Sequence, residues 1–324
     1  MVAMTSILTL RKPGHFTRPV QRDSQNGSLS GPNAQRPKLL NFEDLPEWFQ
    51  DNPSIRSAYR PISYSSWLSL KSLGYLHNES LNIYTHLIPA VASSIAQLFL
   101  QRMITKNFPE ASLRDRFVFS INLFAITVTM ALSTLYHTLI NHSQYISCLW
   151  LRVDYIGILT LILGSFFSGV FVGFYCEPFL QRVYWTMIIT LSIITSVLVM
   201  HPKLQGLEWR THRAWAFIVT GLSGFAPIGH GLFKYGWNQM WVRSGMPFWF
   251  LEGIVYLIGT FFYASRFPES RWPGKYDIWG SSHQIFHVLV VIAAATHFSG
   301  VWSAYAWNYE HNRQCVLSQP TVYP

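Results

Sequence analysis

The chain has 324 residues, of which 50% are hydrophobic and only 12% are charged. Soluble globular proteins carry about 25% charged residues, so this composition indicates a membrane protein. Lys and Arg number 24 against 15 Asp and Glu, but they lie in the N-terminal tail and between apolar runs. A nucleic-acid-binding protein would show a clustered basic face and a recognisable motif, so nucleic acid is excluded as a partner. The three cysteines include no C-x-x-C pair, which leaves His and carboxylates as the available metal ligands.

Runs of about 17 to 25 mostly apolar residues are long enough to cross a membrane as helices. The sequence contains seven such runs, which predict an all-α membrane protein with a seven-transmembrane helix bundle. The predicted spans cover residues 82–101, 117–140, 153–175, 183–200, 214–233, 247–265 and 283–305.

Four regions are expected along the chain. They are a disordered basic cytoplasmic tail at 1–41, an amphipathic juxtamembrane segment at 42–81, the seven-helix domain at 82–305 and a short outer tail at 306–324. Lys and Arg favour the cytoplasmic side of a membrane. The side that holds the N-terminal tail carries 16 of them and the other side 8, although the first loop alone has four. This distribution predicts a cytoplasmic N-terminus and a C-terminus outside.

Small residues predict where helices approach one another closely. Gly157 and Gly164 occupy the third predicted span, and Gly221 and Gly224 occupy the fifth. Pro227, which follows them, predicts a bend in the fifth helix.

Ionisable residues inside membrane spans are costly and by default indicate a functional site. His137 ends the second span, Asp154 begins the third, and His283 and His287 begin the seventh. In a chain that crosses the membrane seven times, these three helix ends must lie on one side. The four side chains therefore share one face of the membrane, whichever way the protein is inserted.

The spacing of these residues predicts a metal site. Residues four apart on a helix project about 40° from one another, so His283 and His287 lie on one face. With His137 they make three histidines, the number of protein ligands typical of a catalytic zinc that keeps a water in its fourth position. Asp154 is placed to take a proton from that water. Ser133, four residues before His137, faces the same way and is placed to orient a ligand or a substrate carbonyl.

Other polar residues receive simpler interpretations. His297 lies about 21 Å along the helix from His283 at 1.5 Å per residue, so we interpret it as a buried side chain hydrogen-bonded to another helix. His86 is interpreted as a helix-packing hydrogen bond, and Glu252 as a residue near a helix end that reaches water. Glu79 is expected to cap the first span or to support the metal ligands. For the site residues, helix-bridging polar contacts and an ion pair between Asp154 and its neighbour Arg152 stay open as alternatives.

Several motifs, in order, resemble one known family. They are HNESLNIYTHL at 77–87, S-x-x-x-H at 133–137, RVDYIGI at 152–158, PGKYDIW at 273–279 and SHQIFHVLVVIAAATHFSGV at 282–301. Together they resemble the progestin and adipoQ receptor family, also grouped with hemolysin III. The likeness is greatest to the adiponectin receptors and the fungal zinc-homeostasis, osmotin-receptor-like members, and it covers roughly residues 60–305.

The resemblance implies a seven-helix protein with a cytoplasmic N-terminus and an intramembrane zinc site near the cytoplasmic face. It implies that Zn²⁺ is bound by His137, His283 and His287, that Asp154 contacts the zinc-bound water, and that Ser133 lies nearby. Family members are linked to ceramide hydrolysis, to lipid and zinc homeostasis and to ligand reception. The N-terminal tail departs from the family's pattern, which leaves the identity of partners open.

The leading hypothesis is a zinc-dependent amidase of ceramide-like lipids with receptor-like regulation. A receptor whose zinc is purely structural and a zinc transport or sensing protein are the alternatives. The expected partners are a membrane lipid, either ceramide-like or a free fatty acid, and an extracellular protein ligand, and an oligomer is compatible with the sequence. The protein is expected to be a multi-pass membrane protein of the plasma membrane or an endomembrane. Cys176 and Cys315 both fall on the outer side, where they are able to pair.

Overall fold

A computed structural model of the chain describes residues 37–204, 207–312 and 315. Over these ranges the regular elements are all helical, and seven helices are long and apolar enough to cross a membrane. The predicted all-α fold with seven membrane-spanning helices is therefore confirmed. Most of the predicted tail at 1–41, and most of the predicted outer tail at 306–324, lie outside the described residues.

The spanning helices extend beyond the predicted apolar spans, because their ends are set by polar caps that hydropathy does not detect. Ser112 and Asp115 form a reciprocal capping box at the start of the second spanning helix, and Ser281 and Gln284 form one at the start of the last. The spans are α2 (Ser80–Asn107), α3 (Leu113–Leu139), α4 (Gln144–Gly173), α5 (Pro178–Met200), α6 (Arg210–Leu222) with α7 (Phe225–Arg243), α8 (Met246–Ser265) and α9 (Ser282–His311).

The fifth span is divided into two helices. It breaks at Ser223 and Gly224, and Pro227 lies in the first turn of α7, where a proline removes no intrahelical hydrogen bond. A Cβ atom on Gly224 would lie 3.3 Å from the Phe166 ring, which confirms a close approach there. The prediction for Gly221 is wrong, because a Cβ atom at that position would meet open space.

Tight packing of α3 against α4 depends on the predicted small residues of α4. A Cβ atom on Gly164 would lie 2.4 Å from the Cβ atom of Ala125, far inside contact distance. Four residues after Ala125 on α3, the Thr129 hydroxyl donates a hydrogen bond of 2.7 Å to the Gly157 carbonyl. The two backbones therefore lie close together, which brings Asp154, one turn before Gly157, toward α3.

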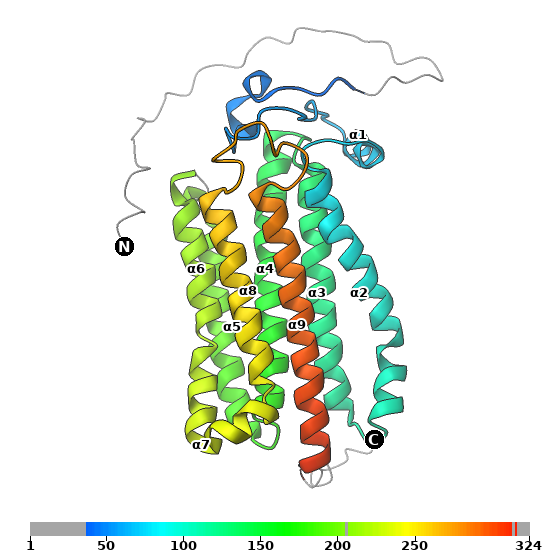
Figure 1. Cartoon of the computed structure of the whole chain (residues 1–324), viewed down its shortest axis with the longest axis vertical. Helices are drawn as coiled ribbons and strands as arrows, with labels where there is room; N and C mark the ends of the chain where they lie inside the picture. The colour runs from blue at the N-terminus through cyan, green and yellow to red at the C-terminus, as the bar shows by residue number, and fades with distance from the viewer. Residues whose placement is uncertain (1–36, 205–206, 313–314, 316–324) are drawn as a thin grey trace. The chain divides into compact units, whose positions relative to one another are not determined.

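Four helix ends lie at the same end of the bundle (Figure 1). They are the starts of α2, α4 and α9 and the end of α3. Residues 37–79 cover this end with three 3₁₀ turns, η1 (Phe42–Asp44), η2 (Glu47–Phe49) and η3 (Ser72–Gly74), and with α1 (Ser66–Lys71). Leu45, Phe49, Ile55 and Tyr59 form a small apolar cluster of their own within this segment. Two further 3₁₀ turns, η4 (Pro202–Leu204) and η5 (Leu207–Trp209), lie between α5 and α6.

A disulfide joins Cys176, just after α4, to Cys315, just after α9, and confirms the expected pairing. Because α4 and α9 both end there, the disulfide lies at the opposite end of the bundle from the starts of these helices. The remaining cysteine, Cys148, is free and exposed near the start of α4. The two ends of the bundle thus carry cysteines in different redox states.

Candidate metal centre

Three histidines meet at the covered end of the bundle, and we call them the histidine cluster. His137 comes from the last turn of α3, and His283 and His287 come from the first two turns of α9. One ring nitrogen from each lies within 4.8 Å of the other two. The Nε2 atoms of His137 and His283 are 3.3 Å apart. The structure therefore brings together the three residues that the sequence singled out.

Residues at the start of α2 contact the Nδ1 atoms of two of these imidazole rings. The Glu79 carboxylate lies 2.8 Å from Nδ1 of His137, and it also accepts a hydrogen bond of 2.7 Å from the Asn82 amide. The backbone carbonyl of Asn82 lies 3.1 Å from Nδ1 of His287. Contacts of this kind fix the tautomer of a metal-binding histidine and turn its other nitrogen toward the ion. Glu79 thus has the supporting role considered for it from the sequence.

Glu79 is ionised in this setting. Burial acts to raise the pKa of its carboxyl, but hydrogen bonds from His137 and Asn82 and the positive charge of Arg60 lower the pKa to about 2. A buried carboxylate that keeps its charge needs several such partners. The negative charge behind His137 makes that ring a better electron donor toward the cluster.

The geometry fits a divalent metal ion. Metal–nitrogen bonds of about 2.0–2.1 Å in a tetrahedral site place neighbouring ligand nitrogens about 3.3–3.4 Å apart. The distance of 3.3 Å between His137 and His283 matches this spacing, whereas the limit of 4.8 Å for the three nitrogens as a set is wider. Three protein nitrogens leave one tetrahedral position for a water or a substrate atom. The cluster can therefore hold a metal ion with an open position.

Asp154 and Ser133 lie beside the histidine cluster on α4 and α3. The Ser133 hydroxyl and the His137 ring are both near enough to the Asp154 carboxylate to influence its charge. Within the described residues Asp154 forms no ion pair with Arg152, so the ion-pair alternative is not supported. All five predicted site residues therefore gather at one end of the bundle.

His86 and Glu252 differ from their simpler interpretations. The ring of His86 stacks on His287, with centroids 3.8 Å apart and planes at 2°, and neither of its nitrogens has a hydrogen-bond partner among the described residues. The expected hydrogen bond of His86 is therefore wrong. Glu252 was expected to reach water; its carboxylate lies 2.7 Å from Nδ1 of His297, and its side chain is 14% exposed. His297 also contacts Ser168 at 3.1 Å, so its interpretation as a buried helix-bridging residue is confirmed.

Arg60 supports the site although nothing in the sequence pattern indicated it. Its side chain is 1% exposed and donates to the backbone carbonyls of His137 and Thr138 at 2.6 and 2.9 Å. These carbonyls belong to the last turn of α3, where unpaired acceptors need donors and a positive charge is favourable. Burial lowers the pKa of Arg60 to about 10, so it stays charged at neutral pH. It therefore fixes the backbone that carries His137.

The fold defines a seven-helix membrane protein, and one end of its bundle holds three histidines that could bind a metal ion. A sequence model of the family described as Haemolysin-III related matches residues 74–298. The chain belongs to this family, and the resemblance to the progestin and adipoQ receptor family is confirmed.

Individual relatives support the assignment. The ADIPOR-like receptor IZH2 of Saccharomyces cerevisiae is 37% identical over 268 residues, which cover 83% of this chain and 84% of the yeast protein. The Adiponectin receptor protein of Drosophila melanogaster is 33% identical over 286 residues, covering 88% of this chain and 64% of the fly protein. Heptahelical transmembrane protein 1 of Arabidopsis thaliana is 32% identical over 277 residues, covering 84% and 83%.

We predict that His283→Gln and His287→Gln each lose bound metal, because each removes one of three ligands while keeping a polar side chain. Metal content per mole of purified protein measures the effect, with the wild type expected near one equivalent. His297→Gln is the matched control on the same helix and keeps its metal. Equal metal loss in all three variants, or a wild type that binds no metal, would contradict a centre at the histidine cluster.

Proposed function

We propose that the protein is a zinc-dependent hydrolase of lipid amides, with ceramide-like lipids as substrates. One observation carries the proposal: three histidine nitrogens that could hold a metal ion, one fewer than a closed tetrahedral site needs, lie near the carboxylate of Asp154. A closed site of four protein ligands would instead favour a structural metal. The family's membrane setting supports a substrate that reaches the site from the bilayer.

His137, His283 and His287 would hold the ion. A bound zinc ion supplies Lewis-acid polarisation and lowers the pKa of a coordinated water toward about 7. Imidazole nitrogens suit zinc, whereas magnesium and calcium prefer oxygen ligands.

The proton chemistry falls to Asp154. One of its carboxylate oxygens accepts the proton of the attacking water, and the same carboxyl then donates a proton to the departing amide nitrogen. The Ser133 hydroxyl, which lies near this carboxylate, would help to orient it toward the cluster. Burial of Ser133, which is 3% exposed, protects this arrangement from bulk water.

A receptor is the second candidate function, because the relatives in yeast and fly are named as receptors. In this case the metal would tie α3 to α9 through His137, His283 and His287. The two functions are compatible, since a receptor can regulate a hydrolytic site. We include lipid and zinc homeostasis, and an extracellular protein ligand, in the same proposal.

We further propose that the histidine cluster faces the cytoplasm and the C-terminus lies outside. Disulfides persist in oxidising compartments and are rare in the cytosol. The disulfide between Cys176 and Cys315 is at the end of the bundle away from the cluster, and the distribution of Lys and Arg favours the same orientation.

Orientation can be tested with a membrane-impermeant thiol reagent on intact cells. After mild reduction, Cys176 and Cys315 become labelled because they face outward. Cys148, which is free and exposed on the cluster side, is the internal control and is labelled only after the membrane is permeabilised. Labelling of Cys148 in intact cells, with Cys176 protected, would contradict the proposed orientation.

Asp154→Asn is predicted to keep the metal and lose hydrolysis. A general base contributes about 10²- to 10⁴-fold to a rate, so fatty acid release from ceramide should fall by that factor. Glu43→Gln, which also replaces a carboxylate by an amide but at an exposed residue, is the matched control and leaves the rate unchanged. A metal-loaded wild type that releases no fatty acid, or an Asp154→Asn variant that equals it, would leave the receptor function instead.

A further inference from the structure

The loop that connects α8 to α9, residues 266–281, buries its acidic side chains. Glu269 is fully buried and accepts hydrogen bonds from the Ser282 amide at 2.7 Å and the Asn52 side chain at 3.2 Å. Asp277 accepts from the Arg56 amide at 2.9 Å and the Ser57 hydroxyl at 2.6 Å. Both carboxylates are therefore used to fasten the loop to the covering segment, and neither adds negative charge to the surface.

The same loop exposes its cations. Arg271 and Lys275 are both exposed, and within the described part of the chain neither makes an ion pair with a carboxylate. Lys275 lies over the Trp272 ring at 5.8 Å, which leaves its charge at the surface. The loop is nearly neutral by composition, but its exposed face is cationic.

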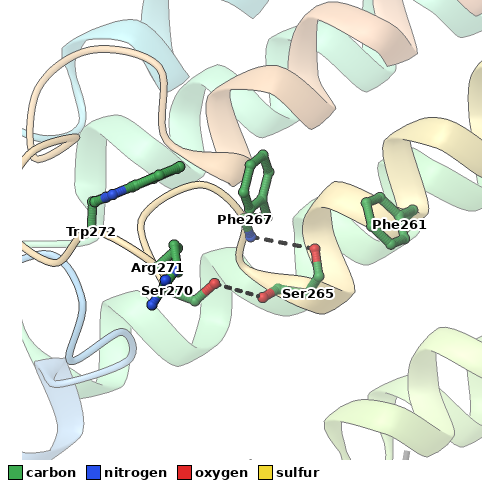
Figure 2. Close-up of a pocket in the computed structure, with 6 residues that line it drawn as sticks. All are labelled: Phe261, Ser265, Phe267, Ser270, Arg271 and Trp272. Carbon is green, nitrogen blue, oxygen red and sulfur yellow. Dashed lines mark hydrogen bonds between the residues drawn. The ribbon is translucent and has the colours of Figure 1, made fainter. Parts of the chain in front are cut away.

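A cavity of about 560 Å³ opens beside Arg271. It is lined by Phe261, Ser265, Phe267, Ser270, Arg271 and Trp272. Figure 2 shows Arg271 next to Ser270, between the Trp272 and Phe267 side chains, while Phe261 lies further along α8. The cavity thus combines one cation, two hydroxyls and three aromatic rings.

An apolar stripe on α8 leads into this cavity. Leu251, Ile254, Leu257 and Phe261 are spaced by three or four residues on one helical face and are 51%, 54%, 63% and 62% exposed. In a membrane-spanning helix such a face contacts lipid chains. Phe261 belongs to both the stripe and the cavity, so the apolar face of α8 continues into the cavity beside Arg271.

We propose that this cavity binds the headgroup of an anionic phospholipid. Its phosphate would pair with Arg271, whose planar guanidinium suits phosphate, and its acyl chains would follow the α8 stripe. Lys275 adds a second positive charge for a net-negative headgroup. The apolar stripe favours a lipid over a soluble anion, which would gain nothing from it. The proposed orientation places the loop on the cytoplasmic leaflet, where anionic lipids are concentrated.

Native mass spectrometry of the full-length protein tests the site. The detergent-solubilised chain is mixed with equal amounts of phosphatidylserine and phosphatidylcholine, and the fraction retaining each lipid is measured. The wild type should retain phosphatidylserine preferentially. Arg271→Gln should reduce that preference about fivefold, the ratio that corresponds to about 1 kcal/mol per basic residue near an anionic surface.

Arg182→Gln is the matched control, because Arg182 is an exposed arginine near the start of α5, at the disulfide end of the bundle. It removes the same charge and should keep the wild-type preference. Equal retention of both lipids by the wild type would show that the cavity does not select an anionic headgroup, and would overturn the proposal. Equal effects of the two substitutions would also overturn it, since net charge alone would then explain binding. Neither outcome depends on hydrolysis or on bound metal.

Discussion

The contact between Glu79 and His137 is the interaction on which the site depends. It joins the residue before α2 to the last turn of α3 at 2.8 Å, with 3% of the His137 side chain and 14% of the Glu79 side chain exposed. A buried carboxylate is costly unless it has several polar partners. Asn82 provides one partner, and its backbone carbonyl orients His287 in turn. One anchored charge therefore sets the positions of two histidines of the cluster, on two different helices.

The surrounding structure keeps this contact in register. Arg60 binds the carbonyls that end α3, while Glu269 and Asp277 fasten the α8–α9 loop to the segment that contains Arg60. Deeper in the bundle, His297 joins Glu252 of α8 to Ser168 of α4. Hydrogen bonds between membrane helices are individually modest, about 0.6 kcal/mol on average. Their value here is positional, because they limit how far α9 can shift relative to α3 and α4.

Much of this architecture follows from sequence patterns with a fixed period. Seven apolar runs predicted the spans, and the four-residue spacing of His283 and His287 placed both rings on one face. His137 and Asp154 followed from topology, because alternate crossings return the chain to the same side. These inferences need only helix geometry and the thickness of a bilayer.

Other features depend on contacts between distant segments, which no local pattern encodes. Asn52 meets Glu269 across 217 positions, and Arg60 meets His137 across 77. Glu252 was expected to reach water from its position in the helix, but its carboxylate contacts His297 on another helix. Pro227 predicted a bend in the fifth span, but not its complete division into α6 and α7, since the apolar composition continues across Gly224. The cationic face of the α8–α9 loop likewise depends on the burial of Glu269 and Asp277, which the sequence does not reveal.

X-ray absorption spectroscopy at the zinc edge of the purified protein tests whether the histidine cluster holds zinc with an open position. We expect three imidazole nitrogens at about 2.0–2.1 Å and one oxygen from a water in the fourth position. Four imidazoles, with His86 completing the set from its place beside His287, would contradict an open catalytic centre, as would a sulfur ligand.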